Sequence, residues 1–206
     1  MARRYILTGA PGSGKTTILA TLRDRGHHVV NEAATDIINA LDAQGIVEPW
    51  GRDDFIDHIV ALQRQRQLAA DREAKGVTVF DRSPVCTLAL ARYVRRPVPA
   101  VLAAELDRIA RQNIYDRRVF FVHNIGFVEP TVARRISYAD SLTFERIHLD
   151  VYRDLGYDIV DVAPGSVADR VAVIEDVLGP ADVLGPASVI RPPAPGCPEP
   201  APETGR

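Results

Sequence analysis

The chain alternates between short apolar runs and longer segments in which apolar residues recur every three to four positions. Turn residues such as Gly26 and Gly76 stand before several of the short runs. Short apolar runs of this kind are typical of buried strands. Strands that alternate with helices predict an α/β fold, with a parallel sheet covered on both faces. The predicted strands are Tyr5–Thr8, His28–Asn31, Val77–Phe80, Arg118–His123 and Tyr157–Val162.

The segments between these runs have the period of amphipathic helices. On the longest of them, Phe55, Ile59, Leu62 and Leu68 recur at helical spacing and predict one buried face. Ligands of parallel α/β sheets bind beyond the carboxyl ends of the strands, so we expect a site there. The predicted helices are one that begins at Lys15, then Ala33–Leu41, Asp53–Ala74, Val85–Tyr93, Pro99–Tyr115, Ser141–Leu155 and Ser166–Leu178.

The turn after the first predicted strand carries a phosphate-binding motif. Residues 9–16 read Gly-Ala-Pro-Gly-Ser-Gly-Lys-Thr, which fits G-x-x-x-x-G-K-[ST] at every fixed position. Glycines let backbone N–H groups approach phosphate oxygens, and the following helix N-terminus carries about half a positive charge. The alternative is a glycine-rich turn without a ligand. The residues predicted to bind a nucleotide are Gly9, Ala10, Pro11, Gly12, Ser13, Gly14, Lys15, Thr16 and Thr17.

Asp81 follows the third predicted strand, where P-loop proteins place an acid that holds Mg²⁺ together with the Thr16 hydroxyl. The alternative role for Asp81 is a helix cap. The next residue is Arg82, whereas motor-type ATPases usually place a second acid there to activate water. This difference favours phosphoryl transfer to an acceptor other than water, with Arg82 in contact with substrate or phosphate.

Glu32 ends the second predicted strand and is the candidate that would orient an acceptor hydroxyl or take its proton. Its alternative role is a charge favoured by the helix dipole. Asp36 lies one helical turn further on and is a weaker candidate. Arg134 and Arg135 lie in an irregular stretch and would offset phosphoryl charge if that stretch closes as a lid; a solvated basic loop is the alternative.

Two further residues are candidates for contact with an acceptor. Trp50 precedes the long helix and would cover a planar or sugar-like molecule, although a core position is the alternative. Gln63 lies on the long helix, on the side expected to face the site. The five histidines have no metal-binding spacing, and we assign them no role.

Composition narrows the classes of function. The formal net charge of −2 among 206 residues offers no positive field for nucleic acid or membrane. Cys86 and Cys197 have neither metal nor disulfide spacing, and Cys86 is expected in the core. With no apolar stretch near membrane-spanning length and an early first strand, we expect a cytoplasmic protein. Residues 1–178 form the predicted domain, and 179–206 a proline-rich tail, solvated from Pro192 onward.

Four segments together resemble the small "AAA domain" family of P-loop ATPases and kinases, which includes the ribosylnicotinamide kinase domain of bacterial NAD-biosynthesis regulators. The segments are Tyr5–Thr16, Asn31–Ala34, Asp81–Ser83 and Tyr152–Tyr157. The resemblance implies three α/β/α layers, strand order 2-3-1-4-5, and ATP with Mg²⁺. It implies Lys15 and Thr16 as nucleotide ligands, Asp81 as the metal-site acid and Glu32 as the acceptor-side acid.

The resemblance also implies that Arg134 or Arg135 is the lid arginine. No ring-assembly signature is present in the sequence, so a monomer or small homo-oligomer is expected. The leading hypothesis is a kinase that phosphorylates a hydroxyl of a small, nucleoside-like molecule. The alternative is a nucleotide-dependent ATPase switch or binding module with a protein partner. A nucleic-acid ATPase is disfavoured by the charge and by the lack of aromatic-basic clusters.

Overall fold

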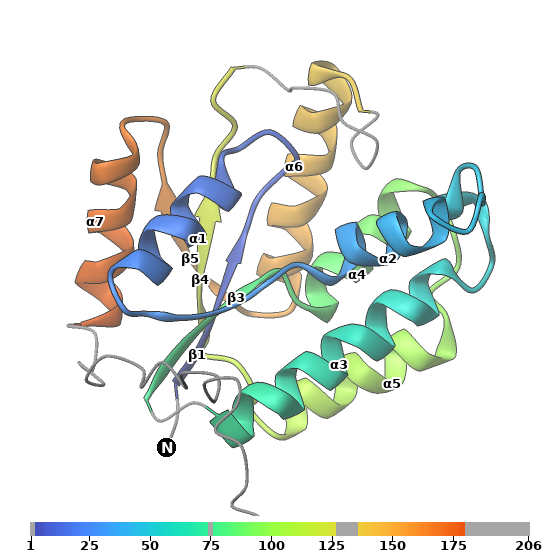
Figure 1. Cartoon of the computed structure of the whole chain (residues 1–206), viewed down its shortest axis with the longest axis horizontal. Helices are drawn as coiled ribbons and strands as arrows, with labels where there is room; N and C mark the ends of the chain where they lie inside the picture. The colour runs from blue at the N-terminus through green and yellow to red at the C-terminus, as the bar shows by residue number, and fades with distance from the viewer. Residues whose placement is uncertain (1–2, 74–75, 127–135, 180–206) are drawn as a thin grey trace, which may run out of the picture.

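The computed structural model describes residues 3–73, 76–126 and 136–179. Its centre is a five-stranded parallel sheet in the order β2-β3-β1-β4-β5 (Figure 1), which confirms the predicted fold class and strand order. Leu7 of β1 is in register with Asp81 of β3 and Phe120 of β4, so the carboxyl ends of the central strands lie together. The strands are β1 (Arg3–Thr8), β2 (His28–Val30), β3 (Val77–Asp81), β4 (Arg118–Val122) and β5 (Asp158–Val162).

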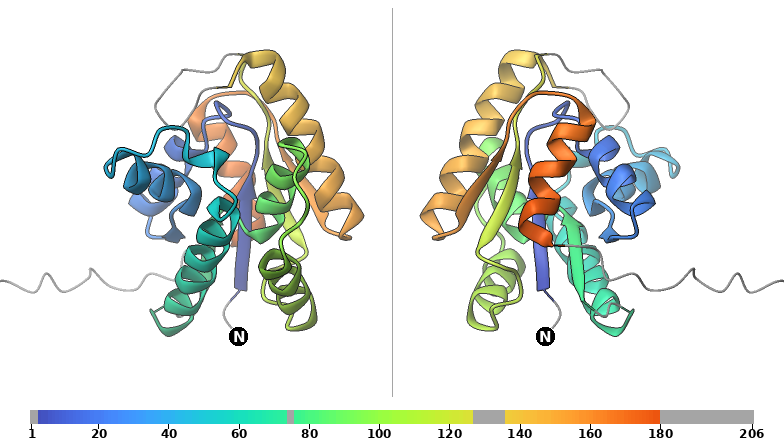
Figure 2. Two further views of the ribbon diagram at one scale, coloured as in Figure 1. Left: turned by 90° about the vertical axis from the view of Figure 1, so that its right-hand side faces the viewer. Right: turned by 90° about the vertical axis from the view of Figure 1, so that its left-hand side faces the viewer.

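Helices cover both faces of the sheet. Figure 1 shows α1 and α7 on one side and α3 to α6 on the other, and the two panels of Figure 2 face these opposite sides. The helices are α1 (Lys15–Asp24), α2 (Ala33–Asp42), α3 (Phe55–Glu73), α4 (Pro84–Tyr93), α5 (Ala100–Arg111), α6 (Tyr138–Asp154) and α7 (Val167–Leu178), with a 3-10 turn, η1 (Pro49–Gly51), before α3.

Each face of the sheet has its own hydrophobic core because successive strand residues point to opposite sides. Tyr5 and Leu7 of β1 pack with α1 and α7, whereas Ile6 between them packs with α3 to α6. A smaller cluster joins α2 to α3 through Ile38, Phe55 and Ile59. This third cluster holds α2 beside the carboxyl end of the sheet.

Several element boundaries differ from the sequence predictions. The helix expected to reach Tyr115 ends at Arg111, because Asn113 adopts a left-handed backbone with φ of 48°. The helix expected from Ser141 begins at Tyr138, because the Ser137 hydroxyl accepts a hydrogen bond from Asp140 N and caps it. Leu68 is 42% exposed, so its prediction as a core residue of α3 was wrong.

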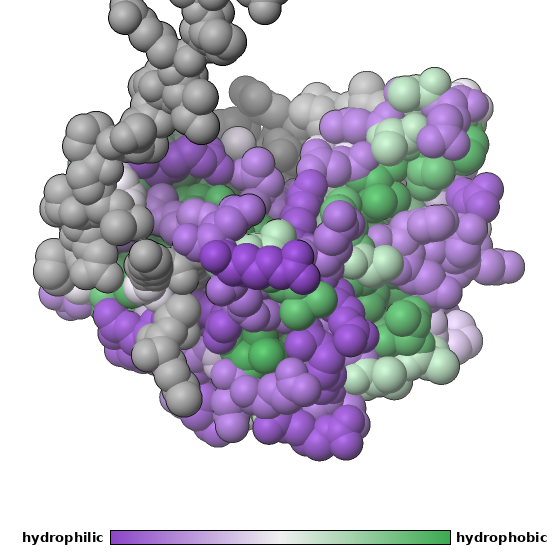
Figure 3. All heavy atoms as spheres, turned by 60° about the horizontal axis from the view of Figure 1, so that its bottom comes forward, coloured by the Kyte–Doolittle hydropathy of each residue, from purple (hydrophilic) through white to green (hydrophobic). Residues whose placement is uncertain are grey.

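The surface in Figure 3, the underside of Figure 1, is mainly hydrophilic, with hydrophobic side chains in separate small groups. None of the helices in the described ranges has the length and hydrophobicity that crossing a membrane requires. The predicted lid residues Arg134 and Arg135, and the predicted tail from residue 180, lie outside the described residues.

Candidate active site

The phosphate-binding loop lies between β1 and α1, as the motif predicts. Gly9 has φ of +141°, and a Cβ atom at this position would lie 2.2 Å from the Val122 carbonyl oxygen of β4. Gly14 has φ of +83° and forms the N-cap of α1. Both positions need glycine, because the first meets neighbouring backbone and both lie in the positive-φ region. The loop therefore presents its amides at the N-terminus of α1.

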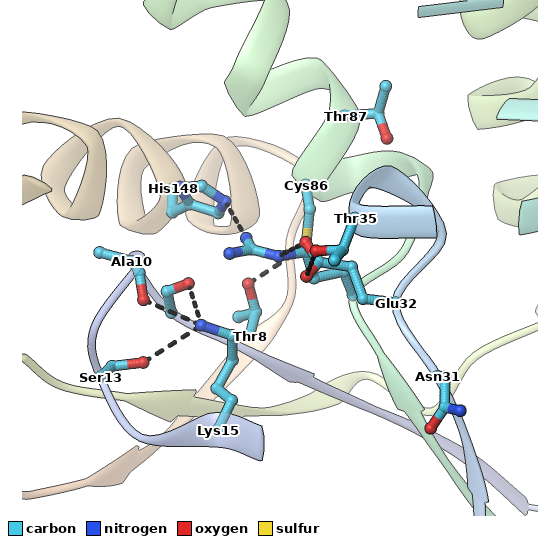
Figure 4. A network of polar contacts seen from close by, with 12 residues as sticks. Thr8, Ala10, Ser13, Lys15, Asn31, Glu32, Thr35, Cys86, Thr87 and His148 are labelled. Atoms are coloured by element: carbon cyan, nitrogen blue, oxygen red, sulfur yellow. Dashed lines mark hydrogen bonds and ion pairs between the residues drawn. The ribbon is translucent and has the colours of Figure 1, made fainter. Parts of the chain in front are cut away.

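Lys15 folds back onto this loop. Its Nζ donates hydrogen bonds to the carbonyl oxygens of Gly9 and Ala10, each at 2.9 Å, and to Ser13 Oγ at 3.2 Å (Figure 4). Burial lowers the pKa of Lys15 to about 7, and the neighbouring Arg82 acts in the same direction. Gly9, Ala10 and Ser13 thus hold the lysine, whereas Pro11, Gly12, Gly14, Thr16 and Thr17 line the adjoining cavity.

Arg170 of α7 supports the phosphate-binding loop by a contact outside the cavity lining, a role that the sequence did not indicate. Only 5% of the Arg170 surface is exposed, and its Nη2 donates a hydrogen bond to the Ser13 carbonyl oxygen. A Cβ at Gly14 would lie 2.9 Å from its Nη1. Burial lowers the pKa of Arg170. A guanidinium in this place adds positive charge behind an anion-binding loop.

Asp81 is the last residue of β3 and lines the same cavity. Its Oδ1 is buried and has no hydrogen-bond partner among the described residues. Burial raises the pKa of Asp81 to about 6, with a further contribution from Glu32. The helix-cap alternative does not hold, because Ser83 caps α4 by accepting a hydrogen bond from Val85 N. An unpaired carboxylate oxygen in a cavity that Thr16 also lines suits a magnesium ion that keeps phosphate ligands.

Arg82 and Glu32 both line the cavity and form an ion pair. Arg82 Nε lies 2.5 Å from Glu32 Oε1, and Thr35 Oγ1 donates to Glu32 Oε2 at 2.8 Å. Burial alone would raise the pKa of Glu32, but Arg82 and then Lys15 outweigh it and hold that pKa below its ordinary value. Glu32 is therefore ionised at neutral pH.

The cavity has a volume of about 690 Å³ and continues from the loop to an apolar wall between α2, α3, α4 and α6. Trp50 and Gln63 both line it, and Gln63 Oε1 accepts a hydrogen bond from Thr87 Oγ1 at 3.0 Å. Trp50 also packs against the α2–α3 cluster, as its alternative role in the core predicts, and its contact with an acceptor stays a prediction. The sequence missed most of the apolar wall: Ile38, Leu90, Tyr93, Val94, Ile136 and Phe144.

Asp36 does not line the cavity. Its carboxylate accepts a hydrogen bond from Arg66 Nη2, and Arg66 Nη1 donates to the Glu32 carbonyl oxygen at 2.6 Å. Asp36 and Arg66 therefore fix the start of α2 from outside, and only Glu32 of the two predicted acids on this helix faces the cavity.

Comparisons with solved structures find the same fold in deoxyadenosine kinase and in NadR. Deoxyadenosine kinase from M. mycoides, with dCMP and dCDP bound, has a TM-score of 0.58 and 14% identity over 85% of this chain and 98% of its own. NadR in complex with NAD and AMP-PNP has a TM-score of 0.61, and NadR in complex with NR one of 0.62, each at 13% identity over 86% of this chain. This chain spans 50% and 51% of those two NadR chains.

The comparison with curated proteins finds no match. A family model described as an AAA domain matches residues 4–170, which include the phosphate-binding loop, Glu32, Asp81 and Arg170. This match confirms the family inferred from the four motifs. The chain belongs to the AAA domain family.

Proposed function

We propose that this protein is a kinase that transfers the γ-phosphate of Mg-ATP to a hydroxyl group of a small nucleoside-like molecule. One observation carries the proposal: a single cavity joins a phosphate-binding loop to a buried acid, an ion-paired arginine and an apolar wall. A pure ATPase has no need for an apolar wall of this kind beyond the phosphates. The fold shared with deoxyadenosine kinase and with a protein crystallised with AMP-PNP is consistent with the proposal.

The loop side would bind the nucleotide. Backbone amides from Gly12 to Thr16 and the Lys15 ammonium would contact the phosphates, and their negative charge would favour the charged form of a lysine whose pKa burial has lowered. Thr16 and Asp81 would hold Mg²⁺. The metal ion would neutralise charge on the phosphate oxygens, as in other P-loop enzymes.

Glu32 would orient the acceptor hydroxyl toward the phosphate. Its lowered pKa makes it a weak base, yet a loose phosphoryl-transfer transition state needs little proton removal before bond formation. Positioning is therefore the main role we assign to Glu32, and the proton passes to its carboxylate as the new P–O bond forms. Arg82, which pairs with it, would offset charge on the transferred group.

The apolar wall would bind the rest of the acceptor. Phe55, Tyr93 and Phe144 offer flat surfaces, and the Gln63–Thr87 pair offers a polar edge among them. This combination suits a planar heterocycle attached to a sugar. A kinase for deoxyadenosine and a protein crystallised with NR share the fold, which supports a nucleoside-like acceptor. Arg134 or Arg135 remains the predicted lid arginine.

An ADP-release screen tests the proposal. Purified protein with Mg-ATP is assayed alone and with nucleosides, ribosides, sugars and other hydroxylated metabolites. We expect slow release with water and a large increase with at least one nucleoside-like acceptor, whose phosphorylated product is identified by mass. Rapid ADP release that no acceptor changes would reject the kinase and favour an ATPase switch.

Matched variants assign the chemistry to the site. We expect Glu32→Gln to lower kcat about a hundred-fold or more, because the amide keeps the shape but loses the charge. Asp42→Asn, which changes an exposed acid on the same helix, should leave kcat unchanged. Equal activity in the two variants would contradict the role of Glu32.

A further inference from the structure

Two helices hold the guanidinium of Arg82 from opposite sides. Glu32, at the start of α2, contacts Nε at 2.5 Å, and His148, in the middle of α6, lies with its Nε2 3.2 Å from Nη1. Figure 4 shows His148 and Glu32 on opposite sides of the space above Lys15. His148 is fully buried, and the sequence assigned it no role.

The backbone of Arg82 directs its side chain inward. Its φ of +69° is rare for a residue with a side chain, and its amide N donates to the Leu7 carbonyl oxygen at 3.0 Å. The side chain is 11% exposed and lines the cavity. A long flexible side chain that enters a ligand cavity from a fixed backbone needs fixed partners to stay in one rotamer.

The hydrogen bonds of His148 define its tautomer. Nδ1 lies 2.9 Å from the Phe144 carbonyl oxygen, which can only accept, so Nδ1 carries the proton. The lone pair of Nε2 then accepts a hydrogen bond from Arg82 Nη1. Burial lowers the pKa of His148 to about 3, and the charge of Arg82 acts in the same direction. The ring is neutral at physiological pH, which keeps Nε2 available as an acceptor.

Packing fixes the orientation of this ring. The rings of Phe144 and His148 meet in an edge-to-face arrangement, with a centroid distance of 4.3 Å and an interplanar angle of 66°. Phe144 packs in turn against Tyr93 of α4 at 4.7 Å, and both of these rings line the cavity. The ring of His148 is thus held by the hydrogen bond from Nδ1 to a helix carbonyl and by contact with an aromatic wall, which fixes the direction of its acceptor Nε2.

We propose that His148 is a positioning residue that fixes the Arg82 guanidinium between the phosphate-binding loop and Glu32. This inference rests on the proposed kinase function, because Arg82 acts there on the transferred phosphoryl group. Without the His148 acceptor, the guanidinium loses one of the two contacts described above, the one at Nη1, and samples other rotamers. Transition-state stabilisation then falls more than nucleotide binding does, since the loop and Lys15 are unchanged.

Three substitutions at one position separate the contact from packing. His148→Gln places an amide oxygen near the position of Nε2 and keeps an acceptor for Arg82. His148→Asn keeps the hydrogen bond to Phe144 O but does not reach Arg82, and His148→Phe fills the space with neither contact. Val151→Ala, at a fully buried residue of α6 whose side chain can form no hydrogen bond with Arg82, is the control for packing loss alone.

We expect His148→Asn and His148→Phe to lower kcat about ten-fold with KM for ATP within about two-fold, while His148→Gln recovers most of the loss. In an Arg82→Met background, His148→Asn should cause no further loss, because the two residues act as one unit. The proposal is overturned if the folded His148→Gln variant has a kcat as low as that of His148→Asn. It is also overturned if His148→Asn lowers kcat as much in the Arg82→Met background as in the wild-type protein, or if Val151→Ala lowers kcat as much as His148→Asn does.

A spectroscopic measurement decides the contact without turnover. In protein labelled with ¹⁵N-histidine, His148 should show the neutral Nδ1–H tautomer, and its Nε2 resonance should move when Arg82 is changed to Met. If no acceptor is phosphorylated but the Nε2 resonance moves in the Arg82→Met variant, the proposed kinase function fails while the contact between His148 and Arg82 is confirmed. The inference is overturned directly if the His148 ring is charged, if it is the Nε2–H tautomer, or if its Nε2 resonance does not change in the Arg82→Met variant.

Discussion

Gly9→Ala tests how the phosphate-binding loop is built onto the sheet. The added Cβ would lie 2.2 Å from the Val122 carbonyl oxygen, which belongs to β4 and cannot move without disturbing its pairing with β5. We estimate about 1–3 kcal/mol for the strained backbone at φ of +141° and about 1–3 kcal/mol more for overpacking. The free energy of unfolding should fall by the sum, about 2–6 kcal/mol.

Gly26→Ala is the matched control. Gly26 also has positive φ, at +90°, but a Cβ there meets nothing within 4 Å, so only the backbone strain applies. Urea unfolding of both variants measures the difference, which we expect to be about 1–3 kcal/mol, or about 2–12 °C in Tm for a domain of this size. Gly9→Ala should also lose affinity for a fluorescent ATP analogue, because the Gly9 carbonyl holds Lys15. Equal destabilisation by the two substitutions would refute the close approach of loop and strand.

Three further predictions concern charged groups. Arg170→Met should weaken nucleotide binding about ten-fold in calorimetric titration, because the hydrogen bond to Ser13 O and the positive charge behind the loop are lost. Asp81→Asn should abolish the magnesium dependence of nucleotide binding yet raise the Tm of the ligand-free protein at pH 7.5, but not at pH 3.5. The raised pKa of about 6 means that Asp81 favours folding below its unfolded pKa and loses that contribution as pH rises through about 6. Burial lowers the pKa of His123, but hydrogen bonds to Asp161 and Glu145 outweigh burial and raise this pKa above 6.5. The contribution of His123 to stability is therefore complete below pH 6.5 and is lost as pH rises through the higher pKa of the folded state. His123→Gln should remove that part of the pH dependence in thermal melts; an unchanged melting profile would contradict the ion pairs.

The parts of the site that the sequence predicts are those that lie on local motifs. The loop, Glu32 and Asp81 each sit at a strand end, and in a parallel sheet strand ends converge at one edge. Arg82 was identified because it stands where another class of enzyme has an acid. These predictions needed only chain order, since strands that alternate with helices form a parallel sheet and end at the same edge.

The parts that the sequence missed depend on contacts across long separations. Arg170 reaches Ser13 across 157 positions, and His148 reaches Arg82 across 66. Both lie inside ordinary amphipathic helices, where periodicity indicates burial but not which polar partner a buried residue meets. The prediction for Leu68 was wrong for a related reason. The buried face of α3 runs through Ile56, Val60 and Ala70, and packing sets the rotation of this helix relative to the sheet.

The pKa shifts together indicate a cavity prepared for a charged ligand. Lys15 and Asp81 are both shifted toward their neutral forms, to about 7 and about 6, because burial disfavours their charges in the ligand-free protein. Glu32 and Arg82, in contrast, stay ionised because each has the other within 2.5 Å. The paired charges thus belong to the ligand-free site, whereas the two shifted groups would reach full charge in the proposed complex, where phosphate and metal would supply the opposite sign. Nucleotide and magnesium should therefore stabilise this protein more when added together than the sum of their separate effects. The metal ion would offset the repulsion between the phosphates and the Asp81 carboxylate, and the phosphates would offset the repulsion between the metal ion and Lys15.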